Sequence, residues 1–463
     1  MRRCLWLLVV SACAHAPESA KTEPAPRRAQ VWVDGSASEG GDGSSARPLK
    51  RLELKGGTVT HLATGLYELS GVLPDDVELV GEGKAVVLFG EGLEAGRATL
   101  RKLAIQGGQV GLTVRGAVTL EQVSFSGQRQ AAVRVEGALT WRGGDVEGSV
   151  PESRGVVVTA GKAEVSDVTF RGALRHGVTV EGGEAIITGC TSDGAATAVH
   201  VSGGRALVQK TKARRGRSAG FSVNGARLEL DDVEVVAHEY GALAGPGSEL
   251  DVDGMTVERT QVGGVGLSGA KGVVKRLHAT SPGSHGGISS LDSQTRAEDI
   301  SIRGAVDLAV LARLGRLDAK KVRIEGVTGD GDGIMVRDAI AVLEDVKVFD
   351  IAGTGVVATA VSTVDLSGLR CEQCLHGALL VERRSTVKAR GIVSISSREA
   401  AVTIPDDGVL ELDGLDVTGN GPGVWAECAP GSRVVLKGRL PARELLSGRC
   451  LELPPPGAPA SPR

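Results

Sequence analysis

The residues best suited to chemistry lie in a glycine-rich segment late in the chain. Asp330 and Asp332 alternate with glycine from Gly329 to Gly333, and carboxylates combined with backbone carbonyls are the ligands that Ca²⁺ prefers. His376 lies two sequence repeats beyond Asp332, which places it about 10 Å away if the repeats stack as neighbouring strands do. Glycine and aspartate are also the residues that tight turns require. The segment is therefore a candidate calcium or catalytic site, or an ordinary turn.

Other polar residues occupy equivalent positions in the repeat. His176, Tyr240 and His285 each lie one or two positions before a short apolar strand, as Asp332 and His376 do. Side chains at equivalent positions of stacked repeats share one side of the molecule. The turn before this strand is therefore the best place to look for a site.

A repeat of about 22 residues must position these groups. Each copy begins with an apolar-x-apolar strand after Gly or Ala, such as Val178 to Val180, and successive copies start mostly 21 to 24 residues apart. Two further short alternating segments follow in each copy, as in 163–165 and 168–170. Period-two alternation broken by Gly, Asp and Ser predicts short strands and turns. Because three such strands cannot bury a core alone, the copies must stack.

The predicted fold is therefore all-β, a single right-handed parallel β-helix of roughly 22-residue coils with three short strands per coil. Fifteen recognised coils at about 4.8 Å per rung give a rod of roughly 70 Å. No segment shows a sustained helical period, and a propeller would need repeats of about 40 residues. Regular coils are predicted for 111–450, with entry coils and a cap at 31–110.

The middle residue of each first strand should point outward, because side chains alternate along a strand. This outward set contains no Asp, Glu or Lys in the clearly aligned coils. Glycoside hydrolysis normally needs two carboxylates, so the face argues against an ordinary hydrolase or lyase. Its predicted members are Thr113, Arg134, Val157, Thr179, His200, Ser222, Leu243, Gly266, Ser289, Met335, Val357, Leu379, Thr403 and Trp425.

The late coils predict an apolar strip on this outward face. Met335, Val357, Leu379 and, after a threonine, Trp425 fall at equivalent outward positions. The unclear coil between them adds Ala309 or Leu311. Continuous exposed apolar side chains often mark contact surfaces, so the strip is a candidate binding surface unless another segment covers it.

The first thirty residues predict export. Arg2 and Arg3 precede a short apolar run and small residues, as in a secretory signal covering residues 1–12. The run from Val10 to Cys13 resembles the lipobox of bacterial lipoproteins, which implies acylation of Cys13 and a membrane anchor. Ordinary cleavage near Ala12 is the alternative. Residues 13–30 then form a lipidated cysteine with a flexible tether. The residue after Cys13 is not Asp, which by the known sorting pattern favours the outer membrane.

Composition limits the possible partners. The formal net charge is −3, so no nucleic acid is expected as a partner. Aromatic residues make up 2% of the chain, which weakens any function that depends on aromatic stacking platforms for sugars or bases. No apolar run approaches the ~20 residues that a membrane-spanning helix needs. The Pro-rich end, 451–463, is predicted to be disordered.

Cysteines suit export without indicating a disulfide scaffold. Cys371 and Cys374 form a CxxC with one member at an inward position, so a structural disulfide or two free thiols is expected. Cys428 and Cys450 are 22 residues apart, one coil, and could stack and bridge the last rung. Cys190 falls at an inward position and is expected to be buried.

The first coils carry a family resemblance. Residues 31–34 (VWVD), a polar loop ending at Pro48, and the segments 65–67 and 77–83 resemble the entry coils of β-helix proteins of the pectate-lyase-like superfamily. That superfamily includes polysaccharide lyases, hydrolases, epimerases, adhesins and inert scaffolds, and it usually places a short helix after the proline. Residues 49–55 are barely long enough for such a helix, so an atypical cap is expected here. Its hydrolases use aspartate clusters and a histidine in turns of this kind, but their motif residues do not match here.

Two functions follow. One is a non-catalytic lipoprotein rod of the cell envelope that binds a surface glycan or protein partner. The alternative is a polysaccharide-active enzyme, a lyase, hydrolase or epimerase, with its site around Asp330, Asp332 and His376. No cofactor is expected, apart from the calcium considered above.

Overall fold

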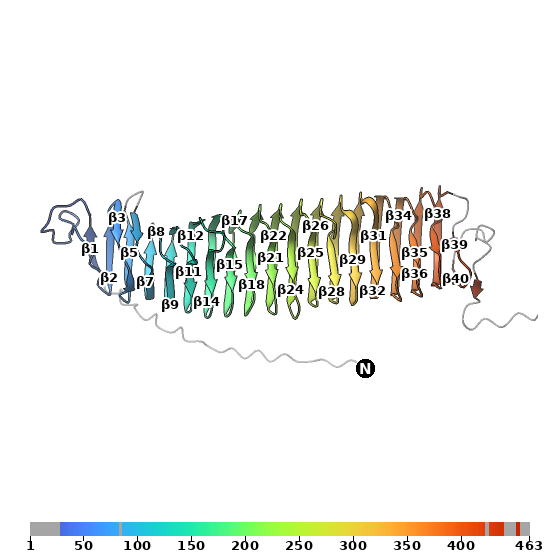
Figure 1. Cartoon of the computed structure of the whole chain (residues 1–463), viewed down its shortest axis with the longest axis horizontal. Coiled ribbons are helices and arrows are strands. Elements are labelled where there is room, and N and C mark those ends of the chain that lie inside the picture. The colour runs from blue at the N-terminus through green and yellow to red at the C-terminus, as the bar shows by residue number, and fades with distance from the viewer. Residues whose placement is uncertain (1–27, 83–85, 422–425, 439–450, 454–463) are drawn as a thin grey trace, which may run out of the picture.

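The alternating segments of the sequence form short strands whose inward side chains are apolar. In β15 (His176–Val180), Val178 and Val180 are buried. Strands of successive coils pair in parallel and in register, as β15 does with the first strands before and after it. The computed structural model describes residues 28–82, 86–421, 426–438 and 451–453. They form a parallel β-helix of about 17 turns (Figure 1), or roughly 80 Å at the spacing of paired strands.

The strands fall into three groups, one for each side of the coil. The described chain contains no helix, so the prediction of an all-β solenoid is confirmed. First strands are β4 (Gly71–Leu73), β11 (Ala131–Val135), β13 (Arg154–Val158), β15, β18 (Thr197–Val201), β21 (Ala219–Val223), β23 (Tyr240–Ala244), β25 (Gly263–Ser268), β27 (Ile288–Leu291), β29 (Val306–Arg313), β31 (Thr328–Arg337), β33 (Val356–Thr359), β35 (Leu379–Val381), β37 (Val402–Ile404) and β39 (Ala426–Cys428).

The second and third strands often run together. They are separate as β1 (Ala29–Val33), β2 (Thr58–Leu62), β3 (Gly65–Glu68), β5 (Val77–Gly81), β6 (Val86–Phe89), β8 (Ala104–Gln106), β10 (Ser124–Ser126), β16 (Glu184–Thr188), β17 (Thr191–Asp193), β19 (Arg205–Gln209), β20 (Lys212–Arg214), β40 (Arg433–Lys437) and β41 (Leu451–Leu453). First and second strands merge in β7 (Leu93–Arg101) and β9 (Val110–Glu121). Second and third merge in β12 (Ala138–Gly148), β14 (Lys162–Gly172), β22 (Arg227–Val236), β24 (Glu249–Glu258), β26 (Lys271–Thr280), β28 (Gln294–Arg303), β30 (Arg316–Glu325), β32 (Ile340–Ile351), β34 (Thr363–Cys374), β36 (Thr386–Ile395) and β38 (Val409–Thr418).

A single left-handed residue turns the chain inside the merged strands. Asp232 in β22 has a φ of 51°, and Gly254 holds the equivalent position in β24 with a φ of 81°. Aspartate and glycine tolerate this conformation better than other residues. One residue therefore makes the corner between the second and third strands without ending the hydrogen-bonded ladder.

The interior is a continuous apolar core along the axis. Most of it is Val, Leu, Ile and Ala, as the composition predicts. An aromatic cluster interrupts the aliphatic ladders early in the rod, where Trp141 packs edge-on against Phe125 and Phe170 with ring centroids 5.2 and 6.4 Å away. All three side chains are buried.

The entry to the rod differs in detail from the prediction. The first strand begins at Ala29, two residues earlier than predicted. No helix follows Pro48; Leu49, Leu52 and Leu54 instead pack against the core from an irregular segment. The signal segment, Cys13, Trp425 and Cys450 lie outside the described residues. Within the described chain, no helix is long and apolar enough to span a bilayer.

Candidate functional site

The outward residues of the first strands stack into one ladder, which we call the outward ladder. From Thr113 to Thr403 it contains no Asp, Glu or Lys, and a carboxylate flanks each end, Glu94 and Glu427. The sequence prediction for this face is therefore confirmed over its central coils. In order, the ladder is Thr113, Arg134, Val157, Thr179, His200, Ser222, Leu243, Gly266, Ser289, Leu311, Met335, Val357, Leu380 and Thr403.

The predicted apolar strip needs a correction at its late end. Leu379 pairs with Val356 and is fully buried, so the prediction that it points outward is wrong, and Leu380 takes the outward position. Residues 378–381 are all apolar, so the sequence alone does not show which of them point inward and which point outward. Trp425 lies outside the described residues, and Glu427 is the outward partner of Thr403.

The corrected strip is Leu311, Met335, Val357 and Leu380. Of the two options for the unclear coil, the structure selects Leu311, which pairs with Met335. Val357 points outward but is only 3% exposed, while the other three are partly exposed. The strip is therefore narrower and less accessible than the sequence predicts.

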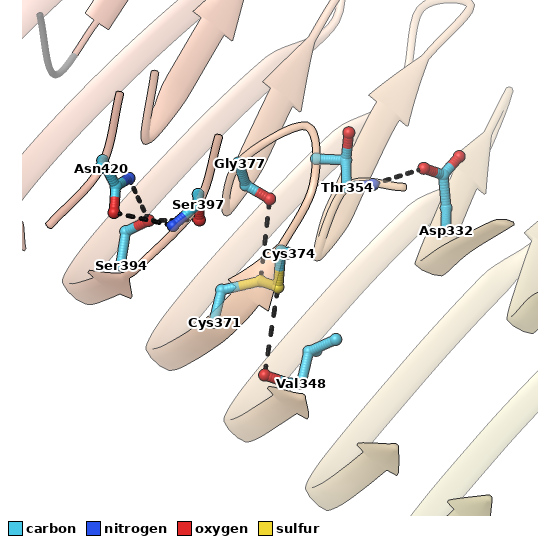
Figure 2. The surroundings of a disulfide bond; sticks show 9 residues. All are labelled: Asp332, Val348, Thr354, Cys371, Cys374, Gly377, Ser394, Ser397 and Asn420. Atoms are coloured by element: carbon cyan, nitrogen blue, oxygen red, sulfur yellow. Dashed lines mark hydrogen bonds between the residues drawn. A yellow bond between two sulfur atoms is a disulfide. The ribbon is translucent and has the colours of Figure 1, made fainter. Parts of the chain in front are cut away.

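The predicted acidic site lies in the first half of β31, so Asp330 and Asp332 belong to a strand and not to the turn before it. Asp332 accepts a hydrogen bond from the backbone N–H of Thr354 at 2.8 Å (Figure 2). His376 Nδ1 lies 2.9 Å from Glu399 Oε1. Burial raises the pKa of the Asp332 carboxyl, and the Thr354 N–H and His376 partly offset that rise. Asp332 and His376 are thus electrostatically coupled but bonded to different partners.

The remaining members of this predicted site do not converge on Asp332. Asp330 is exposed. Arg313 and Arg337 are neighbours in register, but Arg337 is the last residue of β31 and Asp332 lies earlier in the same strand. The extended chain between them spans roughly 16 Å. Within the described residues, no three His, Cys, Asp or Glu side chains come together as a metal site would require. A calcium ion at Asp330 and Asp332 would have to take its other ligands from backbone carbonyls.

A pair of histidines lies on the same face in the middle of the rod. The rings of His176 and His200 are 4.7 Å apart between centroids. Each Nδ1 meets a hydroxyl, Thr179 Oγ1 at 2.9 Å for His176 and Ser222 Oγ at 2.8 Å for His200. These contacts occupy one nitrogen of each ring.

The histidine pair is held in the neutral form. Burial lowers the pKa of His176 to about 3, with further contributions from His200, Arg175 and Arg154. Burial also lowers the pKa of His200, again with Arg175 and Arg154 acting in the same direction and Glu181 opposing them. A neutral imidazole both donates and accepts hydrogen bonds, so the two rings are polar but uncharged, beside the charged Arg154 and Arg175.

Tyr240 and His285 form a second polar pair two coils further on. The Tyr240 hydroxyl lies 2.9 Å from His285 Nδ1. The Tyr240 ring passes over the intervening coil at Gly263 and Gly266, where a Cβ would stand 3.3 and 3.2 Å from Cε1. The sequence placed both side chains in equivalent turns, but sequence reasoning did not predict that they touch. The available signal was the pair Gly263 and Gly266, which leaves room for a ring on the coil between them.

The cysteines behave largely as predicted. Cys371 and Cys374 form a disulfide with a Cα–Cα distance of 6.0 Å, and both are buried (Figure 2). The next coil places Ser394 opposite Cys371, and Ser394 and Ser397 hydrogen-bond with Asn420. Cys190 is a buried free thiol. Cys428 is disulfide-bonded, and its predicted partner lies outside the described residues.

Comparisons with known proteins found only distant similarities. No family model matches the chain, and no curated protein sequence matches it. Among solved structures, a PL6 alginate lyase is similar over 87% of this chain and 98% of its own, at 9% identity and a TM-score of 0.25. The A-module of a mannuronan C-5 epimerase from Azotobacter vinelandii matches over 86% and 91%, at 14% identity and a TM-score of 0.19.

A third solved structure is longer than this chain. A GH136 lacto-N-biosidase from Eubacterium ramulus matches over 85% of this chain at 9% identity and a TM-score of 0.20, and the chain spans 65% of its length. The parallel β-helix that the resemblance implies is confirmed by the strand pairing of this chain itself. Identities and TM-scores of this size transfer neither a function nor a site residue to this chain.

Proposed function

We propose that the chain is an exported lipoprotein whose β-helix is a non-catalytic rod that binds a surface glycan along the outward ladder. The observation that carries this proposal is the run from Thr113 to Thr403 without a carboxylate or lysine. Hydroxyls, apolar side chains, the neutral imidazole of His200 and a single arginine, Arg134, fill it instead. Such a surface offers hydrogen bonds and apolar contact but neither of the paired carboxylates that glycoside hydrolysis uses.

The anchor is the second part of the proposal. Acylation of Cys13 would hold the rod at a bacterial membrane, by its sequence context the outer membrane, through the tether at residues 14–30. Each buried methylene of an acyl chain contributes about 0.8 kcal/mol, and stable anchoring takes more than one chain. We expect the wild-type protein to sediment with membranes and to carry acyl groups on Cys13 by mass spectrometry. A Cys13→Ser variant should move to the soluble fraction; unchanged sedimentation and an unmodified Cys13 would contradict the anchor.

The binding function is tested with the full-length protein and a panel of acidic and neutral polysaccharides. Affinity electrophoresis reports retention, and a reducing-end assay reports new chain ends. Retention without new chain ends supports a binding rod. Absence of retention on every polysaccharide would contradict a glycan partner and leave a protein partner as the occupant of the face.

One observation favours the enzyme as the second candidate. The Asp332 carboxyl has a raised pKa and lies near the His376–Glu399 pair, and a raised pKa suits a general acid. In that case new chain ends appear with the wild-type protein and are lost in Asp332→Asn, while Asp330→Asn retains them. No turnover with the wild-type protein excludes this candidate for the polysaccharides tested.

A further inference from the structure

The Tyr240 ring has an unusual position for this chain. The larger aromatic side chains of the early rod, such as Trp141, Phe125 and Phe170, are buried in the core, whereas Tyr240 is partly exposed on the first-strand face. Its side chain runs along the rod axis and reaches His285, two coils away. An aromatic ring on this face is therefore held in place at both its backbone end and its hydroxyl end.

Glycines beneath the ring let it lie against the sheet. Gly266 is the only glycine in the outward ladder, and Gly263 is the direct partner of Tyr240 in register. A Cβ at either position would come within 3.3 Å of the ring, which is tighter than ordinary van der Waals contact. The two glycines thus remove the side chains that would lift the ring off the backbone.

Along the ladder, the ring is flanked by uncharged residues, both polar and apolar, while Glu239 is a charged residue close to Tyr240. Ser222 lies two rungs before Gly266 and Ser289 one rung after it, with Leu243 between Ser222 and Gly266. His285 completes the set through the tyrosine hydroxyl. An aromatic face flanked by groups that donate and accept hydrogen bonds complements a pyranose ring, which has an apolar C–H face and hydroxyls around its edge.

We propose that Tyr240 and His285 form a subsite for a neutral hexopyranose, with the sugar ring stacked on the exposed face of Tyr240 and its hydroxyls bonded to the flanking serines. This inference rests on the proposed glycan-binding function and names the class of glycan and the point of contact. The absence of carboxylate, lysine and arginine from the ladder between His200 and Leu380 favours a neutral sugar over an acidic one.

The test measures binding by the full-length protein to three neutral polysaccharides, dextran, laminarin and galactomannan, and to alginate and polygalacturonate. We expect retention by at least one neutral polysaccharide, with little change between 50 and 500 mM salt. Tyr240→Ala should weaken that binding about tenfold or more. Tyr240→Phe, which keeps the ring but loses the bond to His285, should weaken it less.

Two further variants keep the test specific. Gly266→Thr adds a side chain under the ring, of the type found elsewhere in the ladder, and should weaken binding as Tyr240→Ala does. Phe89→Ala removes another exposed aromatic, on β6, and should have no effect. Circular dichroism and melting temperature establish that each variant is folded before binding is measured.

The outcomes separate this inference from the function on which it rests. Neutral-glycan binding that survives both Tyr240→Ala and Gly266→Thr would overturn the subsite and leave the glycan-binding rod in place. Binding of alginate or polygalacturonate alone, lost in high salt, would overturn the neutral class. Binding of no polysaccharide by the wild-type protein would overturn both proposals together.

Discussion

Acidification should destabilise the β-helix because the fold holds three histidines in the neutral form. Burial lowers the pKa of His176 to about 3 and also lowers those of His200 and His238. In the unfolded chain each imidazole takes up a proton near pH 6.5, so below that pH the unfolded state binds more protons than the folded state. The contribution of these histidines to the free energy of unfolding is therefore fully present above about pH 6.5. It is lost progressively as the pH falls toward 3.

His176 sets the scale of the effect. Between pH 8 and pH 4, a pKa lowered from 6.5 to about 3 removes at most roughly 3 kcal/mol of folding free energy. Because the ring is partly exposed, solvent screens its repulsion from Arg154 and Arg175 and reduces this figure. With an unfolding entropy of about 2.1 cal/mol/K per residue, the upper value corresponds to roughly 3 °C in a chain of 463 residues.

The assay compares melting temperatures at pH 8, 6, 5 and 4. His176→Thr cannot take up a proton, and threonine already occupies the paired position of the next coil, at residue 197. The variant should therefore lose up to about 3 °C less than the wild-type protein between pH 8 and pH 4. The control is His278→Thr, at an exposed histidine that also pairs with a threonine, and it should follow the wild-type curve. If the melting temperatures of wild type and His176→Thr fell by the same amount between pH 8 and pH 4, the reasoning would be refuted.

Three further predictions concern the architecture. Trp141→Ala should cost about 3–5 kcal/mol by opening a cavity beside two phenylalanines; a denaturant midpoint unchanged from wild type would contradict this packing. Gly155→Ala should sharply lower the melting temperature because its Cβ would stand 2.3 Å from a carbonyl oxygen of the next coil, whereas Gly35→Ala, with open space around it, should be neutral. Replacing Cys371 and Cys374 with serine together should cost roughly 2 kcal/mol by loop-closure entropy, measured against the oxidised wild type; equal stability would show that the crosslink adds nothing.

The sequence predicted the solenoid because its signal is local and repeated. Alternation over three residues sets which side chains face inward, and some fifteen copies of the pattern outweigh the ambiguity of any one. The prediction failed where that local signal vanishes. At Ala378 to Val381 all four residues are apolar, so nothing in the segment selects between Leu379 and Leu380, and only the pairing with Val356 and Val357 fixes the phase.

The polar contacts of the first-strand face were beyond sequence reasoning for a different reason. Tyr240 and His285 are 45 residues apart, and their contact depends on side-chain direction along the axis as well as on coil length. A tyrosine at this position could equally have pointed into solvent. What decides its direction is the absence of side chains at Gly263 and Gly266, on the coil between them.

The position of Tyr240 on this face bears on its proposed role, because the chain has few aromatic residues. The chain has 2 tyrosines and 5 phenylalanines. Phe89 and Phe349 also lie outside the core, but Tyr240 lies over two glycines, which weaken the strand beneath it. Glycine inside a strand costs conformational entropy and side-chain packing, as does holding a tyrosine on an exposed surface. Neither improves the core of the rod, so a core-packing role does not account for the arrangement, whereas the proposed sugar subsite would.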